Sequence, residues 1–497
     1  MQNKKLFLPM ILVLAVTIGS IGTLVVIDVF AGDEPVQENQ MSDEEIMEAV
    51  MEQMGGQEEI NLGDLEEEME KIAQAYHTLM ERYVDEPDAE KLIEGAIIGM
   101  LESLEDPYSE YMDADTASQF MESLDSSFEG IGAEVSMING RVTIVAPFRD
   151  SPAERAGLRP NDQVMEIDGE DIEGLTLTEA VMKIRGEQGT TVTLTIERPG
   201  VTDPLEIDVV RDEIPIETVH SEVIEENGQR IGYLELTSFS ENTAERFEEE
   251  LTALEEDGID GLIIDVRGNP GGYLQSVEDI GNLIIPGGSP ILQIEDRDGE
   301  RMRTISSLDE DIDYPIVSII DEGSASASEI LSAALKEAGG HDVVGQNSFG
   351  KGTVQQTIPM GDGSQLKLTL FRWLTSDGNN INEVGVEPTV EVAQPDFFYV
   401  SPINADEPLV FDMNSEHVES AQVMLSASGY DPGREDGYFD QGTVDAVEAF
   451  QEAEGLDVTG EIGEETADRL QEVLIEQIQD RDNDLQFKRA LELVTGA

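Results

Sequence analysis

The sequence predicts a multidomain α/β protein, and three observations lead to that fold class. With 497 residues, the chain is too long for one hydrophobic core, since single cores stop growing near about 250 residues. Between Arg230 and Pro395, short apolar strands alternate with helical segments, which is the pattern of an α/β core. A segment of short strands and glycine turns, from Phe128 to Asp212, precedes this core, and a small helical unit at 416–475 follows it.

The N-terminus predicts a membrane anchor. A start that carries Lys4 and Lys5 leads into an apolar run from Leu6 to Phe30, which is long enough to span a bilayer. We expect residues 1–31 to be a single-pass signal anchor in the cell membrane, with the two lysines inside and the rest of the chain outside the cytoplasm. The tripeptide Val29-Phe30-Ala31 leaves a cleaved signal peptide as the alternative.

The charge balance restricts the partners. Acidic residues number 108 and basic ones 28, for a net charge of −80, which argues against nucleic acid because phosphate contacts need Lys and Arg. An acidic, lysine-poor chain fits a protein that works outside the cell in salty or alkaline surroundings. The chain has no cysteine, so disulfides, cysteine-based zinc sites and a catalytic thiol are excluded. We expect no metal and no cofactor.

The segment after Phe128 contains a glycine-rich loop that suits a chain terminus. The string GIGAEV, followed by RVTIVAPF and SPAERAGLRPNDQVMEIDG, resembles a PDZ domain of the bacterial protease type. A loop of Gly130, Ile131, Gly132 and Ala133 can turn backbone N–H groups onto a terminal carboxylate, and the next strand offers its edge to an extended peptide. The alternative is a structural β-module.

A serine cluster marks a strand-to-helix turn in the α/β core. Ser324, Ser326 and Ser328 lie between the apolar strand PIVSII and a helix that carries Ile330 and Leu331. A hydroxyl at such a turn is exposed, and the unpaired N–H groups of a helix N-terminus can stabilise an oxyanion. The serines can also be simple helix caps, and composition does not select one of the three.

A lysine and a glycine-rich turn supply further candidate groups. Lys351 precedes the strand TVQQTIPM, and because alternate side chains of a strand share a face, we expect Lys351 and Gln355 to point the same way. A neutral lysine can act as the base for a serine. Another strand, GLIIDV, runs into a turn that contains Gly271. The backbone N–H near Gly271 is expected to complete an oxyanion hole with that of Ala327, and Arg267 to be a salt-bridged core residue.

Together these strings resemble one protease family. NPGG, GSASASEI and SFGKGTVQQ, in this order, and GMLESLEDPYSEYM before them are similar to the C-terminal processing peptidases, also called tail-specific proteases. The C-terminal string with FQ, GL and TG resembles the three-helix peptidoglycan-binding-like domain, and this layout resembles the Bacillus sporulation branch. The resemblance implies a crotonase/ClpP-like Ser–Lys core, with Ser326 as nucleophile, Lys351 as general base and Gln355 as its orienting partner.

The resemblance also implies partners and control. It implies a homodimeric serine endopeptidase, active outside the cytoplasm, that cuts proteins near free apolar C-termini under the control of its PDZ domain, with cell-wall peptidoglycan as a candidate partner. Arg185, at the end of the PDZ-like helix, is expected either to hold the active geometry or to cap that helix. Two alternatives stay open: a Ser-His-Asp hydrolase that uses His341, and a catalytically inactive PDZ and cell-wall scaffold.

These inferences divide the chain into seven segments. They are the anchor (1–31), an acidic stalk (32–60), an N-terminal helical region (61–127), a PDZ domain inserted in or preceding the core (128–213), the serine peptidase core (214–400), a small all-α peptidoglycan-binding-like domain (408–478) and a helical tail (479–497).

Overall fold

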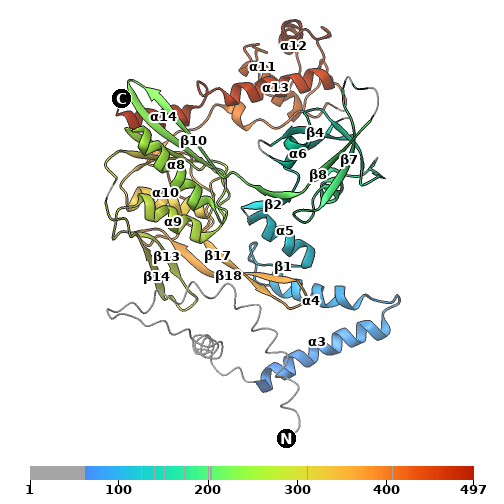
Figure 1. The fold of residues 1–497 in the computed structure, drawn as a ribbon, viewed down its shortest axis with the longest axis vertical. Coiled ribbons are helices and arrows are strands. Elements are labelled where there is room, and N and C mark those ends of the chain that lie inside the picture. The colour runs from blue at the N-terminus through green and yellow to red at the C-terminus, as the bar shows by residue number, and fades with distance from the viewer. Residues whose placement is uncertain are drawn as a thin grey trace. The chain divides into compact units, whose positions relative to one another are not determined.

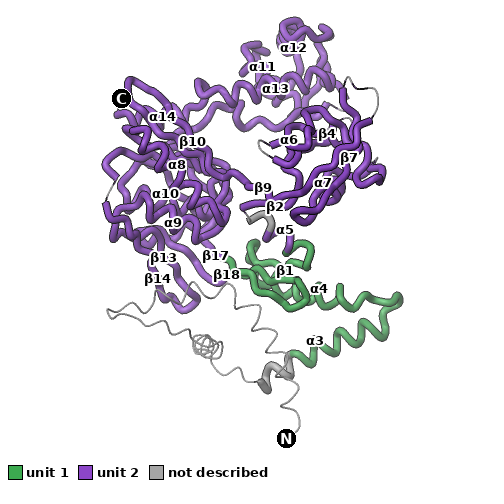
Figure 2. The backbone as a smooth tube through the Cα atoms, in the orientation of Figure 1, with its two compact units in different colours: residues 1–117, 355–369 green, residues 118–354, 370–497 purple. Residues whose placement is uncertain are grey.

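The computed structural model describes residues 62–496, apart from positions 125, 139, 149–150, 173, 200, 202–203, 311 and 406. The predicted anchor and stalk lie outside the described residues. None of the helices in the described range combines the length and the hydropathy of a membrane span. The chain forms two compact units, coloured separately in Figure 2, of which the first holds residues 1–117 with 355–369 and the second 118–354 with 370–497.

The first unit consists of helices and a short stretch of sheet. Its elements are α3 (Leu62–Arg82), α4 (Ala89–Glu102), β1 (Glu110–Met112) and the start of α5 (Ala114–Leu124), with parts of β17 (Thr353–Pro359) and β18 (Gln365–Leu374). Asp88 caps α4, because its carboxylate accepts hydrogen bonds from the first backbone N–H groups of that helix. β1 pairs antiparallel with β18. The helices predicted in the N-terminal region are therefore present.

The second unit opens with a β-rich module. Its elements are β2 (Ser127–Gly130), β3 (Ala133–Ile138), β4 (Arg141–Pro147), α6 (Pro152–Ala156), β5 (Gln163–Ile167), β6 (Glu170–Asp171), α7 (Leu177–Ile184), β7 (Thr191–Glu197), β8 (Leu205–Val210) and β9 (Asp212–Pro215). The main sheet has the order β3-β4-β5-β7-β8, and β2 pairs with β9 where the chain enters and leaves the module. Because β3 ends this order, it is an edge strand, as the sequence predicts.

The α/β core follows. Its further elements are β10 (Val219–Glu226), β11 (Gln229–Leu236), α8 (Thr243–Asp257), β12 (Gly261–Asp265), α9 (Leu274–Ile284), β13 (Pro290–Glu295), β14 (Arg301–Ile305), β15 (Ile316–Ile320), α10 (Ala327–Glu337), β16 (Asp342–Gly345) and β19 (Val390–Glu391). A six-stranded sheet has the order β10-β11-β12-β15-β16-β19. All of its pairings are parallel except that of β10 with β11. β13 pairs with β14 and with the end of β18.

Both faces of the six-stranded sheet are covered, which explains its continuous apolar strands. Leu234 and Leu262 belong to the cluster that includes side chains of α8, α9 and α10. The alternate residues Ile231 and Ile263 belong to a second cluster with side chains of α14 (Leu485–Thr495). Figure 1 shows these covering helices, with α8, α9 and α10 in green to yellow and α14 in red. The C-terminal helix is therefore part of the core layer.

A helical domain lies in the chain between β19 and α14. It contains a 3-10 helix, η2 (Asp396–Tyr399), and three α-helices, α11 (Glu416–Ala427), α12 (Gln441–Glu454) and α13 (Glu464–Gln479). The three helices share one apolar cluster, in which Val418, Phe450 and Leu470 are fully buried. The domain thus has the three helices that the sequence predicts and a core of its own.

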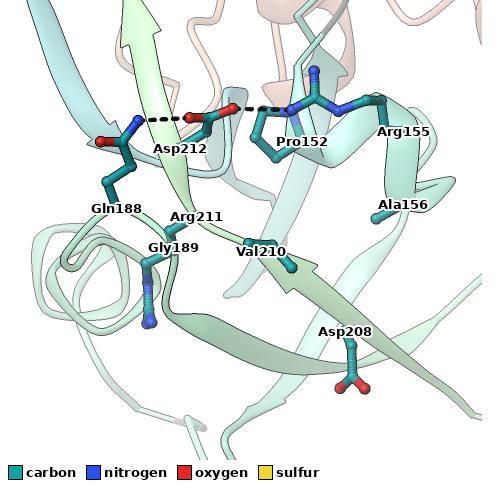
Figure 3. Close-up of a pocket in the computed structure, with 9 residues that line it drawn as sticks. All are labelled: Pro152, Arg155, Ala156, Gln188, Gly189, Asp208, Val210, Arg211 and Asp212. Carbon is teal, nitrogen blue, oxygen red and sulfur yellow. Dashed lines mark hydrogen bonds and ion pairs between the residues drawn. The ribbon is translucent and has the colours of Figure 1, made fainter.

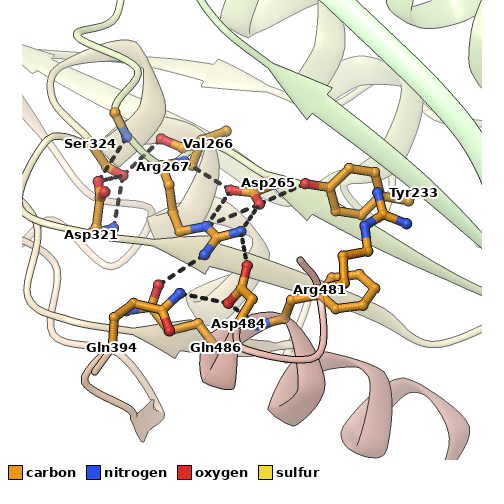
Figure 4. A network of polar contacts seen from close by, with 12 residues as sticks. Tyr233, Asp265, Val266, Arg267, Asp321, Ser324, Gln394, Arg481, Asp484 and Gln486 are labelled. Atoms are coloured by element: carbon orange, nitrogen blue, oxygen red, sulfur yellow. Dashed lines mark hydrogen bonds and ion pairs between the residues drawn. The ribbon is translucent and has the colours of Figure 1, made fainter. Parts of the chain in front are cut away.

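The start of α14 is joined to the sheet by a polar network, shown in Figure 4. The guanidinium of Arg267, just after β12, donates to Asp265 and forms an ion pair of 2.8 Å with Asp484. Asp484 also accepts a hydrogen bond of 2.6 Å from Gln394 and caps α14. The Tyr233 hydroxyl donates to Asp265 at 2.8 Å. Arg267 is therefore a salt-bridged residue, as predicted.

The Asp484 ion pair gives the fold a dependence on pH. Burial by itself raises the pKa of the Asp484 carboxyl, but hydrogen bonding and charge from Arg267 outweigh it, so that the pKa lies below its ordinary value. Such a carboxylate stabilises the fold fully above its unfolded pKa of about 4, and this stability is lost as the pH falls through the folded value. We expect Asp484→Asn to cost about 2 kcal/mol near neutral pH. In thermal melts the difference from wild type shrinks on acidification below about pH 4, and a constant difference would contradict this.

Candidate active site

Three loops follow the carboxyl ends of neighbouring parallel strands. β12, β15 and β16 are adjacent in the sheet, and they lead into the turn with Gly271, the turn with Ser326 and the segment before Lys351, respectively. Ligands and catalytic groups of parallel α/β sheets gather at this edge because all the strands end there. The topology therefore brings together the three elements that the sequence singles out.

The structure distinguishes Ser326 from its two neighbours. The Ser324 hydroxyl is fully buried and donates to the Val266 carbonyl at 2.8 Å, and the Ser328 hydroxyl is fully buried and donates to the Asn269 carbonyl at 2.9 Å. Ser326 is only partly buried and stands at the N-cap of α10 with φ 55° and ψ −111°. That backbone is strained for a residue other than glycine, and such strain is concentrated at functional sites. The hydroxyls of the two outer serines are therefore engaged within the fold, and Ser326 is the serine of the three that is partly exposed.

Glu329 fixes the backbone around Ser326, and the sequence analysis missed it. Its carboxylate is fully buried. One oxygen accepts from the backbone N–H of Ser326 at 2.7 Å and from that of Lys351 at 2.9 Å. The other accepts from the Ser348 hydroxyl and the Gly350 N–H. A buried carboxylate needs such donors, and here they join the serine turn to the lysine loop. The signal was the Ser-x-x-Glu spacing of a capping box.

Gly271 lies directly against the serine turn. A Cβ built on Gly271 would come within 2.8 Å of the Ser326 Cβ and 3.0 Å of the Ala327 nitrogen. With φ at +99° as well, only glycine fits there. The structure thus places Gly271 and Ala327 next to each other and to Ser326. The Gly271 N–H itself donates to the Asn269 side chain at 2.9 Å. The sequence alone does not predict this hydrogen bond.

Lys351 and Gln355 belong to one continuous segment. Lys351 precedes β17 by two residues, so the expectation that it occupies a strand face is wrong in that detail. Its carbonyl accepts a hydrogen bond of 2.7 Å from the Trp373 indole, and its N–H is held by Glu329. Gln355 lies on β17 in the first unit and donates to the Thr369 hydroxyl at 3.1 Å. The loop at Lys351 is therefore fixed through its backbone.

The position of His341 speaks against a Ser-His-Asp arrangement. Ser326 precedes the first residue of α10, and His341 follows its last turn. A helix of 11 residues separates its ends by about 16 Å, far beyond a hydrogen bond. Burial lowers the pKa of His341, and Asp342 only partly offsets this. Of the remaining histidines, His77 lies on α3, His220 on β10 and His417 on α11.

The β-rich module places the predicted carboxylate loop between β2 and β3. Gly130 ends β2, Ala133 begins β3, and Ile131 is buried in the module core. Gly132 has φ +69°, and a Cβ there would lie 2.6 Å from the Ser151 Cβ. The carbonyls of Ile131 and Gly132 accept hydrogen bonds from the chain at the start of α6 and just before it. The loop is therefore a packed turn that tolerates no larger residue at position 132.

The helix-capping role that the sequence offered as one alternative for Arg185 is filled by Arg211. Arg185 is the C-cap residue of α7, and its guanidinium lies 4.9 Å from the centre of the Phe128 ring on β2. The last carbonyls of α7, at Lys183 and Ile184, instead accept hydrogen bonds from Arg211. Arg211 is thus the side chain that satisfies the helix end. Arg185 contacts the strand on which the chain enters the module.

The module also contains a pocket of about 480 Å³, shown in Figure 3. Three of its lining residues are joined by polar contacts, since Asp212 accepts from Gln188 at 2.9 Å and pairs with Arg155 at 3.2 Å. Its lining residues are Pro152, Arg155, Ala156, Gln188, Gly189, Asp208, Val210, Arg211 and Asp212. None of them belongs to the predicted carboxylate loop, but Asp212 pairs with Gly130 of that loop between β9 and β2, so the pocket adjoins it.

Family models match all the main parts of the chain. Peptidase family S41 matches residues 230–392, and a PDZ domain matches 143–198. The N-terminal domain of the activating protease CtpB matches 16–116, and a putative peptidoglycan binding domain matches 414–470. The S41 match contains Ser326, Glu329, Lys351 and Gln355.

Curated relatives match this chain over most of their length. The chain is 52% identical to the carboxy-terminal processing protease CtpB of Bacillus subtilis over 423 residues, which is 85% of this chain and 88% of that protein. It is 39% identical to CtpA of the same organism over 437 residues, 88% of this chain and 92% of that one. Among solved structures, the photosystem II D1 C-terminal processing protease matches with a TM-score of 0.40 and 26% identity, over 65% of this chain and 92% of that one.

The predicted fold class and family are thereby confirmed. The PDZ domain precedes the peptidase core, which decides between the two placements that the sequence left open. The alternative of an inactive scaffold is not supported, since the chain matches proteases over most of its length. The chain therefore belongs to the C-terminal processing serine proteases of peptidase family S41.

Proposed function

We propose that this protease uses Ser326 as its nucleophile and Lys351 as its general base, with Gln355 orienting the lysine amine. One observation carries the proposal. A single oxygen of the buried Glu329 carboxylate holds the backbone N–H groups of both Ser326 and Lys351, so the nucleophile turn and the lysine loop are fixed to each other. Pre-set geometry of this kind is what catalysis by a serine and a base requires.

The reaction follows from these roles. The neutral Lys351 amine takes the proton of the Ser326 hydroxyl while the oxygen attacks the scissile carbonyl, and the protonated amine then gives the proton to the leaving amine. The backbone N–H of Ala327 and that of Gly271 stabilise the oxyanion. Because the Gly271 N–H already donates to Asn269, it is shared or released when the oxyanion forms. Water hydrolyses the acyl-enzyme by the same steps.

The remaining parts of the chain bring substrates to this site. The loop Gly130–Ala133 binds the free carboxylate of an apolar protein tail, and β3 adds the tail to its edge. The protein acts outside the cytoplasm as a homodimer held in the cell membrane by residues 1–31. The helical domain binds cell-wall peptidoglycan or serves contacts between subunits. Support for the capture step is the edge position of β3 and the packed glycine turn before it.

The test of this function is cleavage of a casein-like protein by the full chain. Wild type is expected to release fragments whose new ends lie near the substrate's C-terminus, and Ser326→Ala to release none. Mass spectrometry of the products locates the cuts. A substrate whose C-terminal carboxylate is amidated is expected to be cut more slowly, because the loop loses its charged ligand. Equal cleavage by wild type and Ser326→Ala would exclude the proposed nucleophile.

Control by the PDZ domain is tested at Arg185. If its contact with Phe128 transmits peptide binding to the core, Arg185→Ala lowers the cleavage rate while folding and peptide affinity stay intact. Lys183→Ala is the matched control, because Lys183 lies in the last turn of the same helix and pairs with the exposed Glu170. Peptide affinity and cleavage rate are measured on the same preparations. Unchanged cleavage in Arg185→Ala removes this residue from the mechanism.

A further inference from the structure

We infer that the C-terminal segment is a working part of the catalytic centre, and that Asp484 is a positioning residue for the loop that carries Gly271. Asp484 reaches this loop through Arg267, which stands between β12 and Gly268. The inference rests on the proposed role of the Gly271 loop in stabilising the oxyanion. It assigns to the chain end a function in the chemistry, beyond closing the fold.

The contacts of Arg267 show why a second carboxylate matters. Asp265 already neutralises the guanidinium, since it accepts from Nε and Nη2. Asp484 binds Nη2 at 2.8 Å, and Gln486 accepts from Nη1 at 3.2 Å. Both of these partners come from the C-terminal segment, and Gln486 is 1% exposed. They fix the direction of the planar guanidinium fork, because a bidentate group restricts orientation as well as charge.

The loop beyond Arg267 is held from its other side by the serine turn. The Gly268 N–H donates to Asp321 at 2.8 Å, and the Asn269 carbonyl accepts from the Ala325 N–H at 3.0 Å. The Asn269 side chain then accepts from the Gly271 N–H. Asp484 is therefore linked to Gly271 by its ion pair with Arg267, by the two peptide bonds from Arg267 to Asn269, and by the hydrogen bond between the Asn269 side chain and the Gly271 N–H. A shift of Arg267 displaces the oxyanion donor from the position it needs.

The topology makes this contact sensitive to the helical domain. That domain lies between β19 and α14, and Gln394, which precedes it, donates to Asp484, which follows it. The Leu485 N–H donates back to Gln394 at 3.0 Å. The two ends of the helical domain thus meet at the residue that holds Arg267. A displacement of the helical domain therefore changes the hydrogen bonds between Gln394 and the start of α14.

The test compares Asp484→Asn with a matched control in the full chain. Asparagine is as good a helix cap as aspartate, so the start of α14 is kept while the charge that faces Arg267 is lost. The control is Asp440→Asn, since Asp440 also caps a helix, α12, and pairs with an arginine, Arg434, at 3.2 Å. Steady-state cleavage of a peptide with a free apolar C-terminus gives kcat and KM, and thermal melts report folding.

We expect Asp484→Asn to lower kcat by about tenfold or more with KM nearly unchanged, because the loss falls on the transition state. Asp440→Asn leaves both constants near wild type. A double-mutant cycle with Arg267→Gln is expected to be non-additive, with the double variant hardly slower than Arg267→Gln alone. A tail that only stabilises the fold would lower the melting temperature of Asp484→Asn, leave kcat unchanged well below that temperature, and give additive effects.

Each outcome is decisive. Wild-type kcat in folded Asp484→Asn, or additivity with Arg267→Gln, overturns the inference. If Asp484→Asn does not fold, Gln486→Met removes the Nη1 acceptor and leaves the ion pair, and a selective fall in kcat is again expected. Ser326→Ala separates the two levels of proposal. If the Ser326→Ala variant still cleaves the peptide, the proposed function itself is refuted. If Ser326→Ala is inactive while Asp484→Asn is fully active, only the role of the C-terminal segment is refuted.

Discussion

Ser326→Ala and Lys351→Ala are each expected to lower peptide cleavage by at least about a thousandfold, and the double variant to be hardly slower than either. A nucleophile and its base act as a unit, so the first loss removes most of what the second can contribute. Steady-state rates on one peptide, with melting temperatures to show that the variants fold, measure the effect.

Two controls sharpen this result. Ser324→Ala removes a neighbouring hydroxyl that is buried on Val266, so it costs stability and spares the chemistry. Gln355→Ala is expected to reduce the rate less than Lys351→Ala does, since glutamine only orients the amine. Wild-type turnover in Lys351→Ala would refute the Ser–Lys assignment and would demand another base.

Glu329→Gln is expected to have the second largest effect. The amide keeps the size of the side chain, but one of its ends becomes a donor that faces backbone N–H donors, so at least one buried group is left without a partner. Stability falls by about 3 kcal/mol. The rate falls by about a hundredfold or more, because a displacement of about 1 Å at the reacting groups has that cost.

The matched control for Glu329 is Glu179→Gln. Glu179 has the same capping-box position in α7 and accepts from the Thr176 N–H at 2.8 Å, but it is exposed at the protein surface. Its replacement is expected to shift the melting temperature slightly and the rate not at all. Equal effects of the two substitutions would mean that Glu329 is only a helix cap.

Local sequence patterns were sufficient for the strands and helices that carry the candidate site. The apolar strands that end at Asp265 and before Ser326, and the alternation of strands with helices, predicted an α/β core. The structure shows that its sheet is mostly parallel, and that sheet fixes which loops meet. Periodicity works here because each strand and helix carries its own pattern. The helices of the C-terminal domain were predictable for the same reason.

Contacts between distant segments were beyond such patterns. Ser324 and Ser328 look like Ser326 in the sequence, and they differ only because Val266 and Asn269 accept their hydroxyls in the fold. The partners of Glu329 lie on a loop beyond α10 and β16. The hydrogen bond from Arg211 to the end of α7 was not predictable, since no local pattern links a strand end to a helix end in this way.

The burial of α14 bears on which segments of this chain can adopt the extended form that strand addition requires. Recognition by strand addition requires an extended tail with a free terminal carboxylate. Here the chain remains helical as far as Thr495, and Ala490 and Val494 are buried against the sheet. A Cβ on Gly261 would collide with Val494 at 2.5 Å, so the fit leaves no space between helix and strand. Residues 485–495 are therefore held in a form that strand addition cannot use, and α14 would have to leave the sheet and unwind before this segment could pair as a strand.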